Sequence, residues 1–389
     1  MTHGIRRSPA RLLAGAALVA ALASPAASSA STGVPRIHGG RVIQDFRPHH
    51  ATAGTRALPT AQSTTVTHFS TTVQDGTKTF TDVMVGKNPL VKLSTPSTTI
   101  KTFLIPLKIV LSNHDTFDPM VNGSCDTVSA VTRTTQSPIV LSQAYSQGGT
   151  ALGTGQYTDI FRRAEFFTQT GPAGINPGYH VKLDVVTLPE QTLNVPGADD
   201  AELGKTACGE KTGAFEINWF DKQLTTKVLP SLASQGVTVK TFPMFLLRDA
   251  VGYDTVTANC CILGYHSFTQ TATGRQTYGI SDYESSKRFS DALDVNTLAH
   301  EIGEWQDDPF GNNPTKPWGH TGQVTGCQNN LEVGDPLSGD SINVTTSGHV
   351  YHPQELAFFS WFYHQSPSLG VNGLYSNNGT FTTPAAPCH

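Results

Sequence analysis

The sequence predicts a mixed α/β or α+β domain with a mixed sheet, because strand patterns and helix patterns follow one another along the chain. Residues 99–112 contain a long run of Phe, Leu, Ile and Val that is typical of a strand. Residues 156–167 carry apolar side chains at helical spacing. Only 14% of the residues are charged, against a usual share of about 25%. We therefore expect a weakly charged, globular chain.

The first 63 residues divide into two segments that we expect to precede the folded domain. Residues 1–30 hold a basic start, a short apolar run and a small-residue stretch, which together indicate an export signal peptide. Residues 31–63 lack apolar periodicity and suggest a disordered leader or propeptide. Their histidine pair, His49 and His50, could cap a metal in an active site, although a solvated linker is the simpler interpretation.

Charge and cysteine content define the compartment and the partners. The chain has 26 Lys and Arg against 30 Asp and Glu, so no positive excess exists to bind nucleic acid. No later segment approaches 18 apolar residues, so we expect no membrane anchor after signal cleavage. The signal peptide predicts a secreted, extracellular protein, which we expect to be a monomer. Six cysteines favour disulfide bonds in an exported protein. Cys260 and Cys261 are adjacent, and a bond between them would close a strained ring, so we expect each to reach a distant partner.

The remaining elements follow from local patterns. Residues 64–98 form a β-rich N-terminal segment, because Thr-, Val- and Phe-rich runs alternate with turn signals. Pro106 predicts that the strand at 99–112 is an edge strand or carries a bulge. Further strands are expected over residues 179–188, 237–247, 261–268 and 276–283, and helices over residues 156–167, 217–232 and 353–364.

Residues 296–305 carry the most informative pattern in the chain. Val295, Leu298, Ile302 and Trp305 form one apolar stripe of a helix. Thr297, His300, Glu301, Glu304 and Asp308 fall on the opposite side, and Asp308-Pro309 ends the helix. The alternative to a functional polar face is a solvated face of a surface helix.

The polar face has the spacing of a metal site. His300 and Glu304 lie one turn apart, so both can reach one ion, and Glu301 is placed beside them as a general base for a bound water. This is the arrangement of H-E-x-x-H metalloproteases with the second histidine replaced by glutamate. A carboxylate is an accepted zinc ligand, although it makes the water less acidic and could favour another divalent ion such as Mn or Ca.

A third ligand should come from a different element. Glu332 and Asp335 lie in a tight Gly-Pro turn, and the sequence leaves open which of them binds the ion and which supports it. His320 is a rival third ligand. His266, at the end of a strand, could line the cleft, although a buried core histidine is the simpler interpretation.

A second group of polar residues precedes the expected last helix. His349, Tyr351 or His352 could donate a hydrogen bond to an oxyanion. Capping and packing are the simpler roles for these side chains.

Four segments taken in order resemble a known group of proteins. They are residues 156–167, Gly264-Tyr265-His266-Ser267, His300-Glu301-Ile302-Gly303-Glu304 with Asp308-Pro309, and Glu332-Val333-Gly334-Asp335. The chain resembles a largely uncharacterised group of exported bacterial zincin-like proteins with an H-E-x-x-E helix. The last two segments are also similar to the plant phosphate-induced (EXORDIUM-like) family.

The resemblance implies a zincin-like metallopeptidase domain over residues 99–389, with the metal helix beneath a twisted sheet. It places the strand at residues 276–283 at the sheet edge, where a peptide substrate could add as a further strand. The expected function is an exported zinc hydrolase that cleaves peptides or proteins. The alternative is a non-catalytic secreted cell-wall or carbohydrate-associated protein with a structural metal. A glycosidase ranks last, because Glu301 and Glu304 share one helix and cannot flank a sugar bond.

Overall fold

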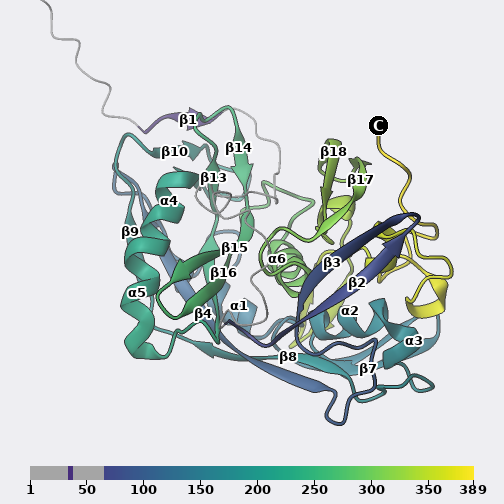
Figure 1. The fold of residues 1–389 in the computed structure, drawn as a ribbon. Coiled ribbons are helices and arrows are strands. Elements are labelled where there is room, and N and C mark those ends of the chain that lie inside the picture. The colour runs from purple at the N-terminus through teal and green to yellow at the C-terminus, as the bar shows by residue number, and fades with distance from the viewer. Residues whose placement is uncertain (1–33, 38–64) are drawn as a thin grey trace, which may run out of the picture. The chain divides into compact units, whose positions relative to one another are not determined.

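A seven-stranded sheet organises the part of the chain that the computed structural model describes, residues 34–37 and 65–389. Its strand order is β15-β16-β12-β4-β5, and β8 and β9 also pair with β4. The strands are β4 (Ser97–Val110), β5 (Thr116–Phe117), β8 (His180–Thr187), β9 (Gln191–Asn194), β12 (Phe242–Arg248), β15 (Gly264–Thr271) and β16 (Gly274–Tyr283). Parallel and antiparallel pairs both occur, so the predicted mixed sheet and α+β class are confirmed (Figure 1).

β4 is the central strand of this sheet, and the predicted edge position is wrong. It pairs with β12 on one side and with β8 and then β9 on the other. Pro106 lies between Leu104, the last residue paired with β8, and Leu107, the first residue paired with β9. A missing N–H is tolerated there because neither strand pairs with residue 106 on that side.

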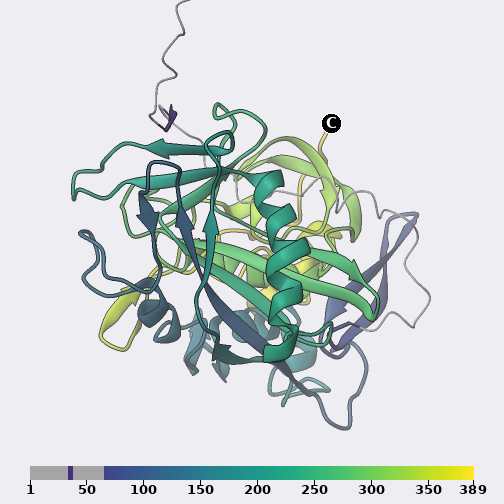
Figure 2. The same cartoon turned by 90° about the vertical axis from the view of Figure 1, so that its left-hand side faces the viewer.

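The two faces of the sheet build two different cores. Ile105 and Leu107 pack with a helical stretch made of α4 (Ile217–Gln223), a π-helical turn (Leu224–Val228), α5 (Leu229–Ser231) and a 3₁₀ turn (Leu232–Gln235). Leu104 and Leu246 pack instead with α6 (Asn296–Asp307). Figure 2 shows the first helical stretch lying across the sheet strands. Since strand side chains alternate between faces, this two-sided burial explains why β4 and β12 are apolar throughout.

All twelve residues of α6 are buried, and this determines where the predicted functional residues lie. It contacts β15, β16, β3 (Lys78–Val85) and α2 (Tyr157–Glu165) (Figure 1). The Trp305 ring stacks on Phe242 with centroids 3.7 Å apart, and its Nε1 donates to Thr277 Oγ1. The predicted helix and its end at Asp308 are confirmed.

Smaller sheets and short helices surround this centre. A five-stranded sheet contains β1 (Arg36–Ile37), β10 (Asp200–Leu203), β11 (Thr212–Glu216), β13 (Ala250–Tyr253) and β14 (Cys260–Ile262). Four hairpins pair β2 (His68–Asp75) with β3, β6 (Gln143–Gln147) with β7 (Thr150–Gly155), β17 (Pro314–Thr321) with β18 (Val324–Asn330), and β19 (Val344–Thr346) with β20 (His349–Tyr351). The remaining helices are α1 (Ala130–Thr135), α3 (Phe167–Thr170) and α7 (Phe359–Phe362), with 3₁₀ turns at Asp335–Leu337 and Val371–Gly373.

Two local predictions are wrong. The strand predicted at residues 276–283 is β16, but β16 lies between β15 and β12, so β15 is the terminal strand. The helix predicted at residues 353–364 is reduced to α7. Residues before α7 are not helical because their N–H groups donate to distant acceptors: Glu355 to Asp340 O, Leu356 to Asn377 Oδ1 and Ala357 to Val333 O. Because these N–H groups donate to distant acceptors, they cannot donate to the carbonyl oxygen four residues earlier, as an α-helix requires.

The predicted leader and signal lie mostly outside the described residues. The structure does not describe residues 1–33 and 38–64, so the signal peptide and the role of the histidine pair at 49 and 50 stay predictions. Arg36–Ile37 forms β1, which pairs in parallel with β10, and Ile37 is buried. This short part of the expected leader is held by a sheet.

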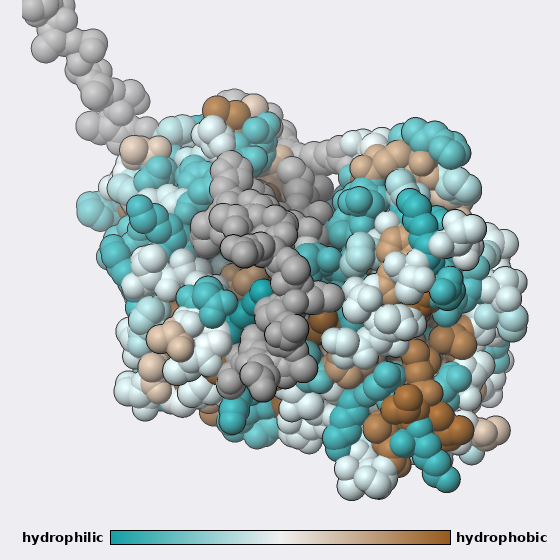
Figure 3. Space-filling view, in the orientation of Figure 1, coloured by the Kyte–Doolittle hydropathy of each residue, from teal (hydrophilic) through white to brown (hydrophobic). Residues whose placement is uncertain are grey.

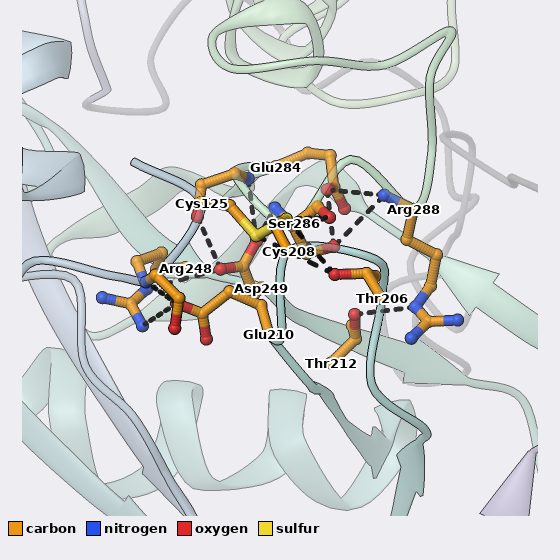
Figure 4. Close-up of a disulfide and its surroundings, with 12 residues drawn as sticks. Cys125, Thr206, Cys208, Glu210, Thr212, Arg248, Asp249, Glu284, Ser286 and Arg288 are labelled. Atoms are coloured by element: carbon orange, nitrogen blue, oxygen red, sulfur yellow. Dashed lines mark hydrogen bonds and ion pairs between the residues drawn. A yellow bond between two sulfur atoms is a disulfide. The ribbon is translucent and has the colours of Figure 1, made fainter. Parts of the chain in front are cut away.

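Three disulfides use all six cysteines. Cys125 bonds Cys208, and Figure 4 shows this bond flanked by Arg248 with Asp249 on one side and by Arg288 with Thr212 on the other. Cys327 bonds Cys388. Cys260 and Cys261 bond each other across a cis peptide bond, so the prediction of distant partners is wrong. The other four cysteines already pair among themselves.

The face of the described part shown in Figure 3 is mainly polar. In the face shown in Figure 3, hydrophilic and neutral residues are interspersed with fewer apolar ones. Large exposed apolar side chains are scattered over several elements, namely Val91, Met120, Val121, Leu141, Ile175, Val186, Val256 and Val350. Among the described residues, no helix combines the length and apolar character that crossing a membrane requires.

Removing the Trp305 ring should destabilise the fold strongly, since it deletes a buried ring stack and a hydrogen bond. We expect Trp305→Ala to lower the free energy of unfolding by about 3–5 kcal/mol in the presence of a chelator. Trp305→Phe should lower the free energy of unfolding by a smaller amount. Val350→Ala, at an exposed site, should change this free energy by less than about 0.5 kcal/mol. Denaturant titration measures all three, and equal values for Trp305→Ala and Val350→Ala would contradict this account.

Candidate functional site

α6 brings three of the predicted functional side chains into the interior. His300 and Glu301 have no exposed surface and Glu304 is 1% exposed. The alternative of a solvated helix face is therefore wrong. Burying ionisable groups is costly unless they are paired, hydrogen-bonded or bound to a metal. The surroundings of these side chains show how the fold compensates this cost.

One set of possible ligand atoms joins α6 to the turn after β18. His300 Nε2 lies 3.0 Å from Glu304 Oε2 and 3.7 Å from Asp335 Oδ1. All three atoms lie within 4.8 Å of one another. Two ligand atoms bound to one tetrahedral zinc are about 3.4 Å apart. The donor set therefore has the composition and the spacing that a divalent cation requires.

A neighbouring amide orients the His300 ring. Gln354 Nε2 donates to the carbonyl oxygen of Gly334 at 2.5 Å, so Gln354 Oε1 is the acceptor that faces His300 Nδ1 at 3.1 Å. Nδ1 then carries a proton, and in the neutral ring the Nε2 lone pair points toward Glu304 and Asp335. Metal-binding histidines are typically held by such a bond from the other ring nitrogen.

The two carboxylates of this set are also held in place. The N–H of Gly334 donates to Glu304 Oε1 at 3.1 Å. Gln328 Nε2 donates to Asp335 Oδ2 at 2.7 Å, and Gln323 Nε2 donates to Asp335 Oδ1. Both glutamines come from the hairpin β17–β18. Each carboxylate thus keeps one oxygen directed at His300 Nε2.

Gly334 is required for this approach. A Cβ atom at this position would lie 2.3 Å from His300 Nδ1. The backbone of Gly334 has φ −85°, which any residue adopts, so the constraint is space and not conformation. The turn contacts the histidine ring face through backbone alone.

A second set of possible ligand atoms lies on the other side of Glu304. His266, on β15, places Nδ1 3.5 Å from Glu301 Oε2 and 3.6 Å from Glu304 Oε2. These three atoms also lie within 4.8 Å of one another. His266 is therefore part of the cluster and not an isolated core histidine. Glu304 belongs to both sets.

The remaining predicted ligands have different positions. Glu332 is buried, its Oε1 accepts from Asn330 Nδ2 at 2.6 Å, and its Oε2 is 4.0 Å from His266 Nε2. It thus faces His266, whereas Asp335 faces His300. His320 is exposed and groups with Cys327 and Cys388, whose sulfur atoms form a disulfide.

Close contact between α6 and β15 fixes Glu301. A Cβ atom on Gly264 would lie 2.8 Å from Glu301 Oε1 and 2.6 Å from Thr297 Cγ2. The missing side chain lets the helix approach the first residue of the terminal strand. Glu301 therefore lies beside this strand, next to the two donor sets.

A buried ion-pair network holds the end of α6. Arg162 of α2 pairs with Glu165 and with Asp307, and its Nη2 donates to the carbonyl oxygens of Val85 and Gln306. Burial raises the pKa of Glu165 to about 7, and the charge of Arg162 opposes that rise. Removing one partner would leave an uncompensated buried charge.

A second pair holds the start of α6. Asp294 Oδ1 accepts from the N–H groups of Val295 and His352, and its Oδ2 lies 2.6 Å from His352 Nδ1. This hydrogen bond raises the pKa of His352, against the effect of burial. His352 thus pairs with Asp294 beside the start of α6, which has no side-chain cap of its own. Tyr351 Oη donates to Arg133 O, which is a packing role.

Sequence reasoning missed the amides that surround the cluster. Gln323, Gln328, Asn330 and Gln354 have no characteristic spacing, and Gln354 lies 54 residues from His300. The sequence analysis names His266 as a residue that could line the cleft, but not as part of a ligand set. The segment Gly264-Tyr265-His266-Ser267, through its resemblance to known proteins, was the feature of the sequence that pointed to it.

Comparisons of the chain with protein-family models, with curated proteins and with solved structures gave no match. The site must therefore be interpreted from its own chemistry.

Adding one methyl group at Gly334 should disturb the cluster. In Gly334→Ala the new Cβ forces the His300 ring to move, so we expect zinc affinity to fall at least about tenfold. Gly326→Ala on β18 is the matched control, because a Cβ there has nothing within 4 Å. Competition with a chromogenic zinc chelator measures both. Equal affinities in the two variants would show that the ring position is irrelevant to binding.

The pair of His352 and Asp294 should make stability depend on pH. Because the folded-state pKa of His352 is raised above 6.5, its stabilising effect is complete below pH 6.5 and is lost as the pH rises through the raised value. We expect the melting temperature of the wild type to exceed that of His352→Asn most at pH 5.5–6, and the gap to narrow by pH 8.5. Thermal unfolding at several pH values, with chelator present, measures this difference in melting temperature. A difference that does not change with pH would contradict the proposed pairing of His352 with Asp294.

Proposed function

We propose that the protein is a metal-dependent hydrolase, and specifically a zinc peptidase, in which His300, Glu304 and Asp335 hold the ion and Glu301 is the general base. The observation that supports this is the convergence of one imidazole nitrogen and two carboxylate oxygens, each held by a further hydrogen bond. Convergent, oriented donors of this kind are what a catalytic zinc site requires.

The chain's own residues define the remaining chemistry. A divalent ion in this position would lower the pKa of a water molecule and polarise a carbonyl group. Glu301 lies one residue after His300 on α6, so its carboxylate can accept the proton of the attacking water. The same carboxylate can then return the proton to the leaving amine. His300 and Glu304 stay fixed by Gln354 and Gly334 during these transfers.

The position of β15 supports an extended peptide as the substrate. β15 is the terminal strand of the seven-stranded sheet, it runs antiparallel to β16, and it packs against α6. A peptide that adds to a sheet edge binds through main-chain hydrogen bonds. The sequence resemblance to zincin-like proteins suggests the same geometry, with β15 taking the place first assigned to residues 276–283.

A second candidate function is a secreted wall- or carbohydrate-associated protein with a structural metal. Complete burial of His300, Glu301 and Asp335 favours it, because structural sites are closed to solvent. The two functions differ in one measurable property: a catalytic site keeps a position for water and substrate.

Metal content and hydrolysis measured on the same samples test the proposal. We expect the full-length wild type to retain at least one equivalent of zinc and to hydrolyse casein. His300→Ala should lose the ion, and Glu301→Gln should retain it while hydrolysis falls by about 10²–10⁴-fold. Glu190→Gln is the control, since this carboxylate pairs with Lys108 outside the site.

The outcomes separate the two functions. Bound zinc without hydrolysis in the wild type would favour the structural metal. A wild type that binds no zinc would overturn both proposals. Loss of hydrolysis in Glu190→Gln as well would show that the assay reports stability and not chemistry.

A further inference from the structure

His266, Glu301 and Glu304 form a second donor set, from which the proposed ion takes only Glu304. Its three atoms belong to β15 and to two positions of α6 one turn apart. His266 is 8% exposed, Glu304 is 1% exposed and Glu301 is fully buried. An imidazole nitrogen and two carboxylate oxygens form the same type of donor set as His300, Glu304 and Asp335.

The hydrogen bond of His266 to the backbone directs its other nitrogen at the carboxylates. Nε2 lies 3.0 Å from the carbonyl oxygen of Asp308, and a carbonyl can only accept, so Nε2 donates its proton there. In the neutral ring the Nδ1 lone pair then faces Glu301 and Glu304. Distances of 3.5 and 3.6 Å exceed a hydrogen bond and match the spacing of about 3.4 Å between ligands of one ion.

We propose that His266, Glu301 and Glu304 form a second divalent-cation site that shares Glu304 with the first and inhibits the enzyme when it is filled. This inference rests on the proposed hydrolytic function for its effect on activity, whereas the site itself stands on geometry. Zinc and manganese are the cations that suit one nitrogen and two carboxylate oxygens.

Inhibition follows because Glu301 is both the proposed general base and a ligand of the second cation. As a general base this carboxylate must be able to accept a proton from water. A carboxylate whose oxygen binds a cation is a much weaker base, because protonation must compete with the ion. Filling the second site therefore removes the proton acceptor while the first ion stays bound.

The two sites should fill in a fixed order. His300 and Asp335 of the first set are held by Gln354 and by two glutamines of the β17–β18 hairpin, and the Gly334 N–H holds Glu304, which both sets share. In the second set the Asp308 carbonyl orients His266. Since such outer contacts raise metal affinity by roughly 10–100-fold, the first set should bind more tightly. The enzyme is then active with one equivalent and inhibited at higher metal concentration.

A metal titration of the metal-free full-length protein tests the inference. Isothermal calorimetry with zinc should resolve a tight and a weaker equivalent in the wild type. His266→Ala and His266→Gln should keep the tight equivalent and weaken the other at least about tenfold. Casein hydrolysis of the wild type should rise with the first equivalent and fall with the second, and in both variants the fall should disappear. Circular dichroism checks that each variant is folded.

Each result has a distinct meaning. A single equivalent in the wild type and in both variants, with no inhibition by excess zinc, would overturn the second site and leave the proposed function intact. No bound zinc in the wild type would overturn the proposed function and the second site together. Two equivalents that both persist in the folded His266 variants would place the second ion elsewhere and would also overturn the inference.

Discussion

The structure depends on one constraint: a helix that carries ionisable side chains is buried along its whole length. His300, Glu301 and Glu304 on α6 have almost no exposed surface. A buried charge costs several kcal/mol unless it is compensated. The amide side chains and the Gly334 N–H around α6 provide part of this compensation, and a cation at the cluster would add to it.

The enclosing elements come from distant parts of the sequence. β15 supplies His266 and allows close approach at Gly264, the turn after β18 supplies Asp335, and the segment before α7 supplies Gln354. That segment cannot be helical, because its backbone groups bond to three other regions. The site therefore forms only when most of the fold is present, and isolated α6 carries the motif without the geometry.

Local patterns predicted α6 and its ligand spacing because both depend on a helical period within a dozen residues. The same reasoning placed β4 correctly in the chain but wrongly at the sheet edge. Proline removes one donor, and only the strand order shows that residue 106 falls in a gap between two partners. His266 was predicted only as a side chain that could line the cleft, and Gln354 was not predicted, since the roles of both depend on contacts across more than 30 residues. The bond between Cys260 and Cys261 could not be predicted from the number and spacing of the cysteines either, because that reasoning assumes that bonded cysteines are separated in the sequence.

The Cys327–Cys388 disulfide links the formation of the site to oxidation. It joins β18 to a segment 61 residues further along the chain. β18 also carries Gln328, and the turn that follows it carries Asp335. A reduced chain would thus lose a covalent restraint on the strand that precedes Asp335, whereas His300 and Glu304 would stay on α6. If the cluster binds a metal as we propose, oxidation of these two thiols should favour metal binding.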